Sequence, residues 1–324
     1  MSILANIKKN YHLNFLDDQI KSKNYQQIEK HLQKIIQTGN PLIFELLEHV
    51  LLKTINNTES EKLFKRKIVW VNSFDLEDVR YINSFLNYYF SKTNTNFSKV
   101  QAYETVLLSL LSNFSTSHRI EFENFVRNSA IYQFFILLNQ TSPFVFLNTN
   151  AAFFEAPKNK QFTYTNFTQA YIYICSNPLK ILKRYVDGGL SKSDAIIQLC
   201  NLDKSLYEHK IDDTKLDLTA MVNRQNWAVN FQSWNDNNVK LTFQGHLIDN
   251  DDLLNSPEDS LIELLSHLNV SSIEFETNYK YVEEFIYHHE FRPQSPIEIS
   301  NKEKKIILRE LNLASTEKIL EKFF

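Results

Sequence analysis

Residues 25–55 read YQQIEKHLQKIIQTGNPLIFELLEHVLLKTI, and this stretch carries two consecutive helix signals. In its first half, apolar residues recur every three or four positions, as they do along one face of a helix, at Tyr25, Ile28, Leu32, Ile35 and Ile36. Gly39 ends this helix, and Asn40-Pro41 begins the next, because Asn caps helices well and Pro is favoured at the first helical position. The second helix is apolar around most of its circumference, so we expect it to lie at the centre of a helical bundle.

The same periodicity continues over the first 140 residues. Further apolar stripes at helical spacing predict helices near residues 63–71, 73–90, 100–114 and 117–138, and Thr58-Glu59-Ser60-Glu61 forms a capping box before the first of them. Short polar loops between successive helices are typical of antiparallel neighbours. We therefore predict a mainly α protein whose residues 1–140 form an antiparallel helical bundle or an irregular helical solenoid.

Residues 141–190 have a different composition, with aromatic side chains and prolines in place of regular helical stripes. Gln161-Phe162-Thr163-Tyr164-Thr165 alternates polar and aromatic residues, which favours a short strand or an extended loop. Gly188-Gly189 is the one glycine pair and the best candidate for a hinge. We interpret this range as an aromatic-rich connecting region.

The clearest strand signals lie between residues 227 and 243. Apolar and polar residues alternate over Trp227–Trp234 and again over Val239–Phe243, on either side of the polar turn 235–238. This pattern predicts an antiparallel hairpin with one apolar face. Ile273–Glu276 is a third strand candidate, and helical stripes follow near residues 256–268, 279–289 and 302–311. Residues 191–324 are therefore predicted to form a smaller α+β module.

Composition excludes several classes of function. The chain has 324 residues and 4 Gly, and it contains neither glycine-rich phosphate-binding motif, which disfavours a nucleotide cofactor. A formal net charge of −3 gives no global basic field for nucleic acid or an anionic membrane. Two cysteines cannot build a disulfide scaffold, so we expect a reducing, cytoplasmic location. The longest apolar run without interruption in the uncharged segment 128–154 is Phe134–Leu138, too short for a membrane span.

The candidate catalytic residues are few and scattered over the C-terminal half. Glu284 and His288 are four residues apart, so both would lie on one face of a helix. His246 and Asp249 are the other two candidates. Because zinc needs three or four ligands and neither pair supplies them, we predict no bound metal and no cofactor.

A basic run precedes Trp70 and offers a second kind of site. Its cations are Lys62, Lys65, Arg66 and Lys67. Basic residues beside an aromatic ring can hold a nucleic-acid strand. The same residues also fit the solvated face of an amphipathic helix, and the sequence favours this interpretation.

The leading hypothesis for function is a non-catalytic protein–protein interaction or scaffold component of an intracellular assembly, with a protein partner. It rests on absent motifs and balanced charge, and these absences also weigh against an enzyme without excluding one. The alternative is an enzyme whose site is assembled from scattered His and carboxylate residues of the C-terminal half. A nucleic-acid-associated protein is the third hypothesis.

Overall fold

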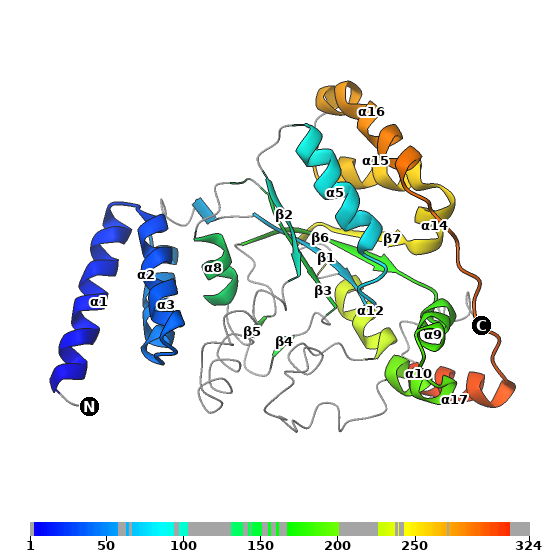
Figure 1. The fold of residues 1–324 in the computed structure, drawn as a ribbon, viewed down its shortest axis with the longest axis horizontal. Helices are drawn as coiled ribbons and strands as arrows, with labels where there is room; N and C mark the ends of the chain where they lie inside the picture. Colours follow the sequence, from blue (N-terminus) through cyan, green and yellow to red (C-terminus); the bar gives the residue numbers. More distant parts are fainter. Residues whose placement is uncertain are drawn as a thin grey trace.

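A computed structural model describes residues 3–57, 63–64, 67–93, 97–102, 131–138, 142, 144–150, 155–156, 160–161, 167–200, 226–236, 239, 243–270 and 272–311 (Figure 1). The helices are α1 (Ile3–Lys21), α2 (Tyr25–Gln37), α3 (Leu42–Ile55), α5 (Arg80–Lys92), α8 (Ile131–Leu137), α9 (Pro178–Asp187), α10 (Lys192–Cys200), α12 (Trp227–Asn235), α14 (Asn250–Asn255), α15 (Pro257–His267), α16 (Ser272–His288) and α17 (Asn301–Leu311). The strands are β1 (Ile68–Ser73), β2 (Phe97–Ala102), β3 (Phe144–Thr149), β4 (Glu155–Ala156), β5 (Lys160–Gln161), β6 (Thr168–Cys175) and β7 (Gly245–Asp249).

A five-stranded sheet of order β2-β3-β1-β6-β7 organises the described chain. All four of its strand pairings are parallel. The chain leaves β1 for the edge strand β2, returns to β3, and then passes β1 to reach β6 on its other side. The direction of winding therefore changes beside β1, which makes β1 the centre of the sheet in both position and topology.

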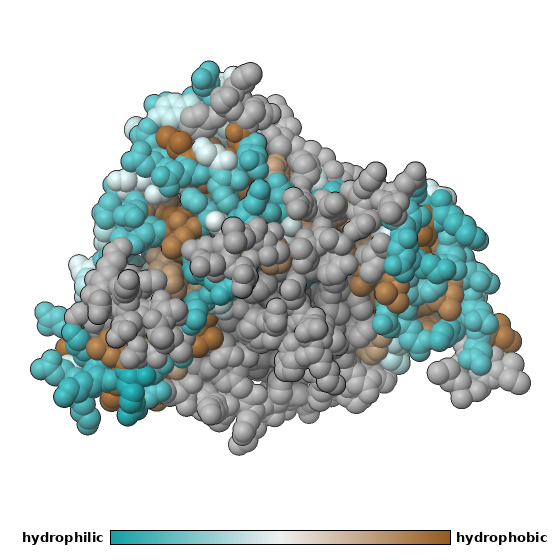
Figure 2. All heavy atoms as spheres, turned by 180° about the vertical axis from the view of Figure 1, so that it is seen from behind, coloured by the Kyte–Doolittle hydropathy of each residue, from teal (hydrophilic) through white to brown (hydrophobic). Residues whose placement is uncertain are grey.

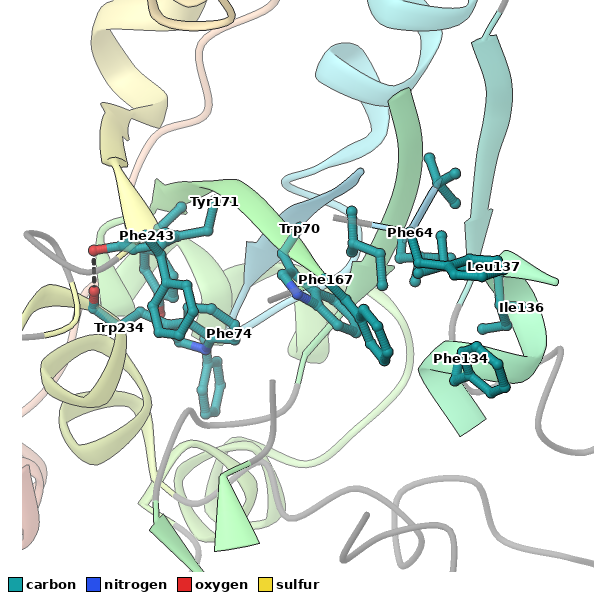
Figure 3. Close-up of a cluster of buried hydrophobic side chains, with 14 of the residues drawn as sticks. Phe64, Trp70, Phe74, Phe134, Ile136, Leu137, Phe167, Tyr171, Trp234 and Phe243 are labelled. Carbon is teal, nitrogen blue, oxygen red and sulfur yellow. Dashed lines mark hydrogen bonds between the residues drawn. The ribbon is translucent and has the colours of Figure 1, made fainter. Parts of the chain in front are cut away.

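Helices cover both faces of this sheet, as a parallel sheet requires. The six residues of β1 are all buried, and they alternate between two hydrophobic cores. One core, which includes Trp70, lies under α3, α8, α10 and α12, and the other, which includes Val71, lies under α5, α15 and α16. Figure 1 shows α1, α2 and α3 as a separate layer beyond α8, and Figure 3 shows the ring cluster around Trp70.

The predicted fold class is wrong. The described chain is an α/β protein with a central parallel sheet, not a helical bundle joined to an α+β module with an antiparallel hairpin. The segment predicted as the first hairpin strand is helix α12, which Asn226 caps by accepting a hydrogen bond from the Val229 backbone N–H at 2.8 Å. Trp227 and Phe231 fit both a strand's alternation and one helical face, but Trp234 joins them on one face only in a helix, and all three side chains are buried under the sheet. Val239 and Phe243 are helical too.

Two further elements differ from their sequence patterns. Ile68 and Val71 were assigned to a helix, but Ile68–Ser73 is the central strand, because a strand buried on both faces is apolar without alternation. Ile273–Glu276, the third strand candidate, lies inside helix α16. The five strands of the sheet come from all three of the ranges 1–140, 141–190 and 191–324.

The described surface carries apolar residues in small groups. Figure 2 shows a mainly hydrophilic described surface on one face, with separated apolar residues. Large exposed apolar side chains, among the described residues, are Ile7, Tyr11, Leu52, Leu63, Leu247 and Tyr287. No described helix is both long enough and apolar enough to cross a membrane.

Candidate functional site at the carboxyl edge of the sheet

Polar side chains gather where the central strands end. β1 ends at Ser73, β6 at Cys175 and β7 at Asp249, and because the strands are parallel, these ends share one edge of the sheet. In open α/β sheets this carboxyl edge, beside the strand where the winding changes direction, is where ligands bind. The connections that follow β1, β6 and β7 therefore supply the side chains of the candidate site.

The core of the site is a buried cluster of two carboxylates and one guanidinium. Arg184 Nη2 lies 2.8 Å from Asp78 Oδ1 and 2.9 Å from Asp75 Oδ2. Ser73 Oγ donates to Asp78 Oδ2 at 3.1 Å, and the amide of Asn250 donates to Asp78 Oδ1 at 3.3 Å. The Asp78 side chain is 1% exposed, whereas those of Asp75 and Arg184 are 13% and 16% exposed, so Asp78 lies deepest.

Burial sets the ionisation of this cluster. Loss of water around the carboxyl raises the pKa of Asp78 to about 7, against the charge of Arg184, which lowers it, and with the charge of Asp75, which raises it further. The two carboxylates in turn raise the pKa of Arg184 against the opposing effect of its own burial, so the guanidinium stays charged. Asp78 can therefore hold or release a proton near neutral pH beside a fixed positive charge.

Local sequence places each member of the cluster. Ser73 Oγ accepts from the Asp75 backbone N–H at 3.3 Å, which bends the chain directly after β1. Asn177 caps α9 and Pro178 occupies its first turn, so the helix starts at the end of β6 and carries Arg184 over the β1 connection.

β7 supplies the remaining wall of the site. Asp249 caps α14 by accepting from the Asp251 backbone N–H at 2.9 Å. Asn250, at the start of α14, turns toward Asp78, and Asp251 binds Lys180 Nζ at 2.5 Å. The two helices α9 and α14 are thus joined across the edge by charged and amide groups.

The same edge also carries uncharged polar groups. Asn72, the penultimate residue of β1, has Thr149 of β3 and Tyr173 of β6 as its register neighbours. The Tyr173 hydroxyl donates to Asn230 Oδ1 at 2.8 Å, and Asn230 Nδ2 donates to the carbonyl of Asn150 at 2.8 Å. Asn72 is fully buried, and neither atom of its amide has a hydrogen-bond partner among the described residues.

The charged face of this edge fits neither a metal nor a phosphate group well. Among the described residues, no three His, Cys, Asp or Glu side chains are grouped as metal ligands. The connection between β1 and α5 contains Asp75, Glu77 and Asp78 and no glycine, so it repels phosphate and lacks the conformational freedom to wrap it. The chemistry that the cluster offers is proton transfer.

Comparisons with known proteins give a likeness to solved structures and none to a protein family or a curated protein. No protein-family model matches the chain, and no curated protein matches it. Among solved structures, it resembles the mouse sulfotransferase SULT7A1 complexed with PAP, with 10% sequence identity and a TM-score of 0.45. That match covers 79% of this chain and 89% of the sulfotransferase.

The prediction of a non-catalytic helical scaffold is wrong. The helical scaffold that it assumed is not present, because the described chain is built around a five-stranded parallel sheet. The scaffold prediction also did not include the cluster of charged side chains that Asp75, Asp78 and Arg184 form at the edge of the sheet.

The four residues proposed from the sequence do not form one site. His246 and Asp249 belong to β7, whereas Glu284 and His288 belong to α16. Glu284 accepts from the Tyr88 hydroxyl at 2.7 Å, and His288 is exposed beside the ring of Tyr287. Only Asp249 lies at the carboxyl edge, where it positions α14.

His246 takes part in a separate buried contact. Its ring stacks on that of His267 of α15, with centroids 4.9 Å apart and an interplanar angle of 23°. Burial lowers the pKa of His246, and burial together with the charge of His246 lowers the pKa of His267 to about 4. Both rings are therefore neutral at physiological pH.

The basic run is mostly outside the described residues. Lys62, Lys65 and Arg66 are not described, and Lys67 is half-buried where the chain enters β1. Burial lowers the pKa of Lys67, whose backbone N–H donates to the carbonyl of Phe167 at 2.8 Å. A nucleic-acid surface at this run stays a prediction.

Asp75, Asp78, Arg184 and Asn72 were missed in the sequence. A signal for the first two exists: the short apolar run Ile68–Val71, bounded by polar residues, is typical of a buried parallel strand. The residues just after such a strand are candidates for a site at the carboxyl edge. The partnership with Arg184 carries no such signal, because 106 residues separate it from Asp78 and only the strand order joins them.

Proposed function

We propose that the chain is an enzyme that uses general acid–base chemistry at the carboxyl edge of its sheet. Asp78 is the group that holds and releases the proton, and Arg184 fixes its position and the charge around it. Asp75, which is more exposed and shares the same guanidinium, forms the outward side of the cluster. This proposal keeps the enzyme hypothesis but replaces its residues.

The single observation that supports it most is the ionisation of Asp78. A carboxyl with an ordinary pKa of about 3.9 is always charged at neutral pH and is a weak base. With a pKa of about 7, Asp78 is divided between its two forms, which is the best condition for both taking and giving a proton at that pH. A strongly shifted group beside a specific charged partner, at the edge where α/β proteins bind ligands, is typical of an active site.

The proposal is tested by turnover in a complete metabolite mixture. Purified protein is incubated with a small-molecule extract of the source organism, and mass spectrometry follows which species disappear and which form. We expect the wild-type chain to convert at least one species and Asp78→Asn to lose at least about 100-fold of that rate, the usual contribution of a general acid or base.

The matched control is Asp187→Asn, which removes an exposed carboxyl that pairs with Lys183 four residues earlier. This variant should keep the wild-type rate. Thermal melting and gel filtration of each variant separate loss of chemistry from loss of fold. Equal turnover by folded Asp78→Asn and wild-type protein would contradict the proposal.

We also propose a reducing compartment for the protein. Cys175 and Cys200 are not joined in a disulfide, and both are buried in the described core. Free thiols persist where glutathione keeps them reduced, which supports the cytoplasm.

A further inference from the structure

The side-chain amide of Asn72 has no hydrogen-bond partner among the described residues. Its side chain is fully buried at the end of the central strand, and both Nδ2 and Oδ1 are without a hydrogen-bond partner. A buried polar group without a partner loses its hydrogen bonds to water and destabilises the fold, so most buried polar groups in folded proteins have a partner. A primary amide with both ends unused therefore indicates a partner from outside the chain.

The surroundings of Asn72 define the chemistry of that partner. On the same face of the sheet, Thr149 and Tyr173 flank it in register, and Asn230 of α12 binds the Tyr173 hydroxyl. These groups are hydroxyls and amides, each of which can donate and accept. Tyr173 and Asn230 already bind each other and the Asn150 carbonyl. The Asn72 amide, which has a donor and an acceptor, matches a ligand whose own groups also do both, as neighbouring hydroxyls do.

Charge at this edge disfavours an anionic ligand. Among the described residues there, Arg184 is bound by Asp75 and Asp78, and Lys180 is bound by Asp251. A phosphate, sulfate or carboxylate group would have to displace one of these carboxylates. An uncharged ligand needs no such exchange.

We infer that Asn72 binds hydroxyl groups of an uncharged, polyhydroxylated substrate, such as a sugar, at the carboxyl end of β1. This inference rests on the proposed function for the identity of the site, because the same edge of the sheet carries Asp78. It adds the class of substrate and the residue that selects it. Asn72 is a binding residue, and Asp78 is left as the acid–base group.

The test measures ligand-induced stabilisation of the full chain, without turnover. Melting temperatures are recorded with D-glucose, N-acetyl-D-glucosamine and myo-inositol as neutral probes, and with glucose 6-phosphate and inorganic phosphate as anionic ones. We expect at least one neutral probe to raise the melting temperature of the wild-type chain, and neither anionic probe to do so. We expect Asn72→Leu to lose this response completely.

The stability of Asn72→Leu without any probe is a second measurement. If the amide has no hydrogen-bond partner until a ligand binds, an apolar side chain of similar size should raise the melting temperature of the free protein. Thr54→Val is the matched control, because Thr54 Oγ1 is also buried without a partner but lies in α3, away from the edge. That variant should gain stability and keep the response to the probe. Asn72→Ala, which is smaller, covers the case in which Leu does not fit.

Three results would overturn the inference. One is a response of the wild-type chain to the anionic probes alone, or to no probe. Another is a response that folded Asn72→Leu or Asn72→Ala retains. The third is a lower melting temperature of both free Asn72→Leu and free Asn72→Ala, which would show that the amide has a structural partner. A binding response at Asn72 with unchanged turnover in Asp78→Asn would refute the acid–base proposal alone.

Discussion

At the scale of single residues, burial determines how the polar groups at the carboxyl edge behave. Asn72 lies at the end of β1 and Asp78 shortly after it, and burial affects them differently. The Asp78 carboxyl has a raised pKa and a charged partner, whereas the Asn72 amide has no hydrogen-bond partner among the described residues. Neither behaviour can be recognised in the sequence, because Asp and Asn are ordinary after a strand. Both residues can be recognised as candidate site residues only when the structure shows that they are buried at the edge of the sheet.

Gly245 shows the same dependence on a neighbouring strand. A Cβ at this position would lie 2.1 Å from the ring tip and hydroxyl of Tyr171, its register partner in β6. The Tyr171 hydroxyl donates to the carbonyl of Trp234, as Figure 3 shows, so the ring cannot move without losing that bond. Glycine here is needed for close approach rather than for an unusual backbone angle.

We predict that Gly245→Ala destabilises the chain by about 1–3 kcal/mol, as overpacking in a core does. Urea denaturation followed by tryptophan fluorescence measures the change, because Trp234 reports on this contact. Gly188→Ala is the control, since a Cβ there would meet backbone oxygens at 3.2 Å or more and needs only a small adjustment. Equal stability of Gly245→Ala and the wild-type chain would show that the Tyr171 ring is not held in place.

At the scale of elements, helices with amphipathic stripes could be predicted and buried strands could not. α2 follows its stripe from Tyr25 to Ile36, and α15 and α17 lie close to their predicted ranges. The stripe that begins at Leu63 failed because Ile68–Ser73 is apolar on both faces, which removes the alternation that marks a strand. The segment Trp227–Trp234 was predicted as a strand and is a helix. Its first residues alternate as in a strand, whereas Trp227, Phe231 and Trp234 share one helical face.

The contact between β7 and α15, where His246 stacks on His267, predicts how the stability of the chain depends on pH. His267 has a pKa of about 4 in the folded chain and about 6.5 when unfolded. Between these values, the unfolded chain binds a proton that the folded chain does not, so the free energy of unfolding falls as the pH falls through this window. We predict that His267→Phe, which cannot titrate, is less sensitive to acid over this window.

Urea denaturation at about pH 7 and about pH 5 measures this difference. His288→Phe is the control, because His288 is exposed on α16 and its replacement should leave the acid sensitivity of the wild-type chain unchanged. An identical loss of stability on acidification in His267→Phe and wild-type protein would refute the role of the stacked pair.

At the scale of the whole molecule, the order of the strands creates the site. Asp78 follows β1, Arg184 lies in the helix after β6, and Asn250 follows β7, and these meet only because β1, β6 and β7 are adjacent in a parallel sheet. Sequence patterns place residues on elements, but strand order depends on packing that no local pattern records. For this reason the predicted candidates were limited to one helix and one short segment, and only Asp249 lies near the site.

Residues assigned to the core from the sequence were more reliable than the fold built from them. Leu47 and Phe85 are both buried, as their stripes indicated, but they lie in cores on opposite faces of the sheet. Hydrophobic periodicity predicts that a side chain is buried, but it does not predict in which of the two cores the side chain lies. The same stripes therefore fitted a helical bundle and an α/β fold equally well.

The most direct measurement is the titration of Asp78 itself. With ¹³C-labelled aspartate, the carboxyl signal that disappears in Asp78→Asn can be followed by NMR as the pH is changed. The account predicts that this signal titrates with a pKa of about 7, because the carboxyl is buried and shares Arg184 with Asp75. A pKa at or below the ordinary value of about 3.9 would contradict it, since Asp78 would then be a permanently charged partner of Arg184 and no acid or base.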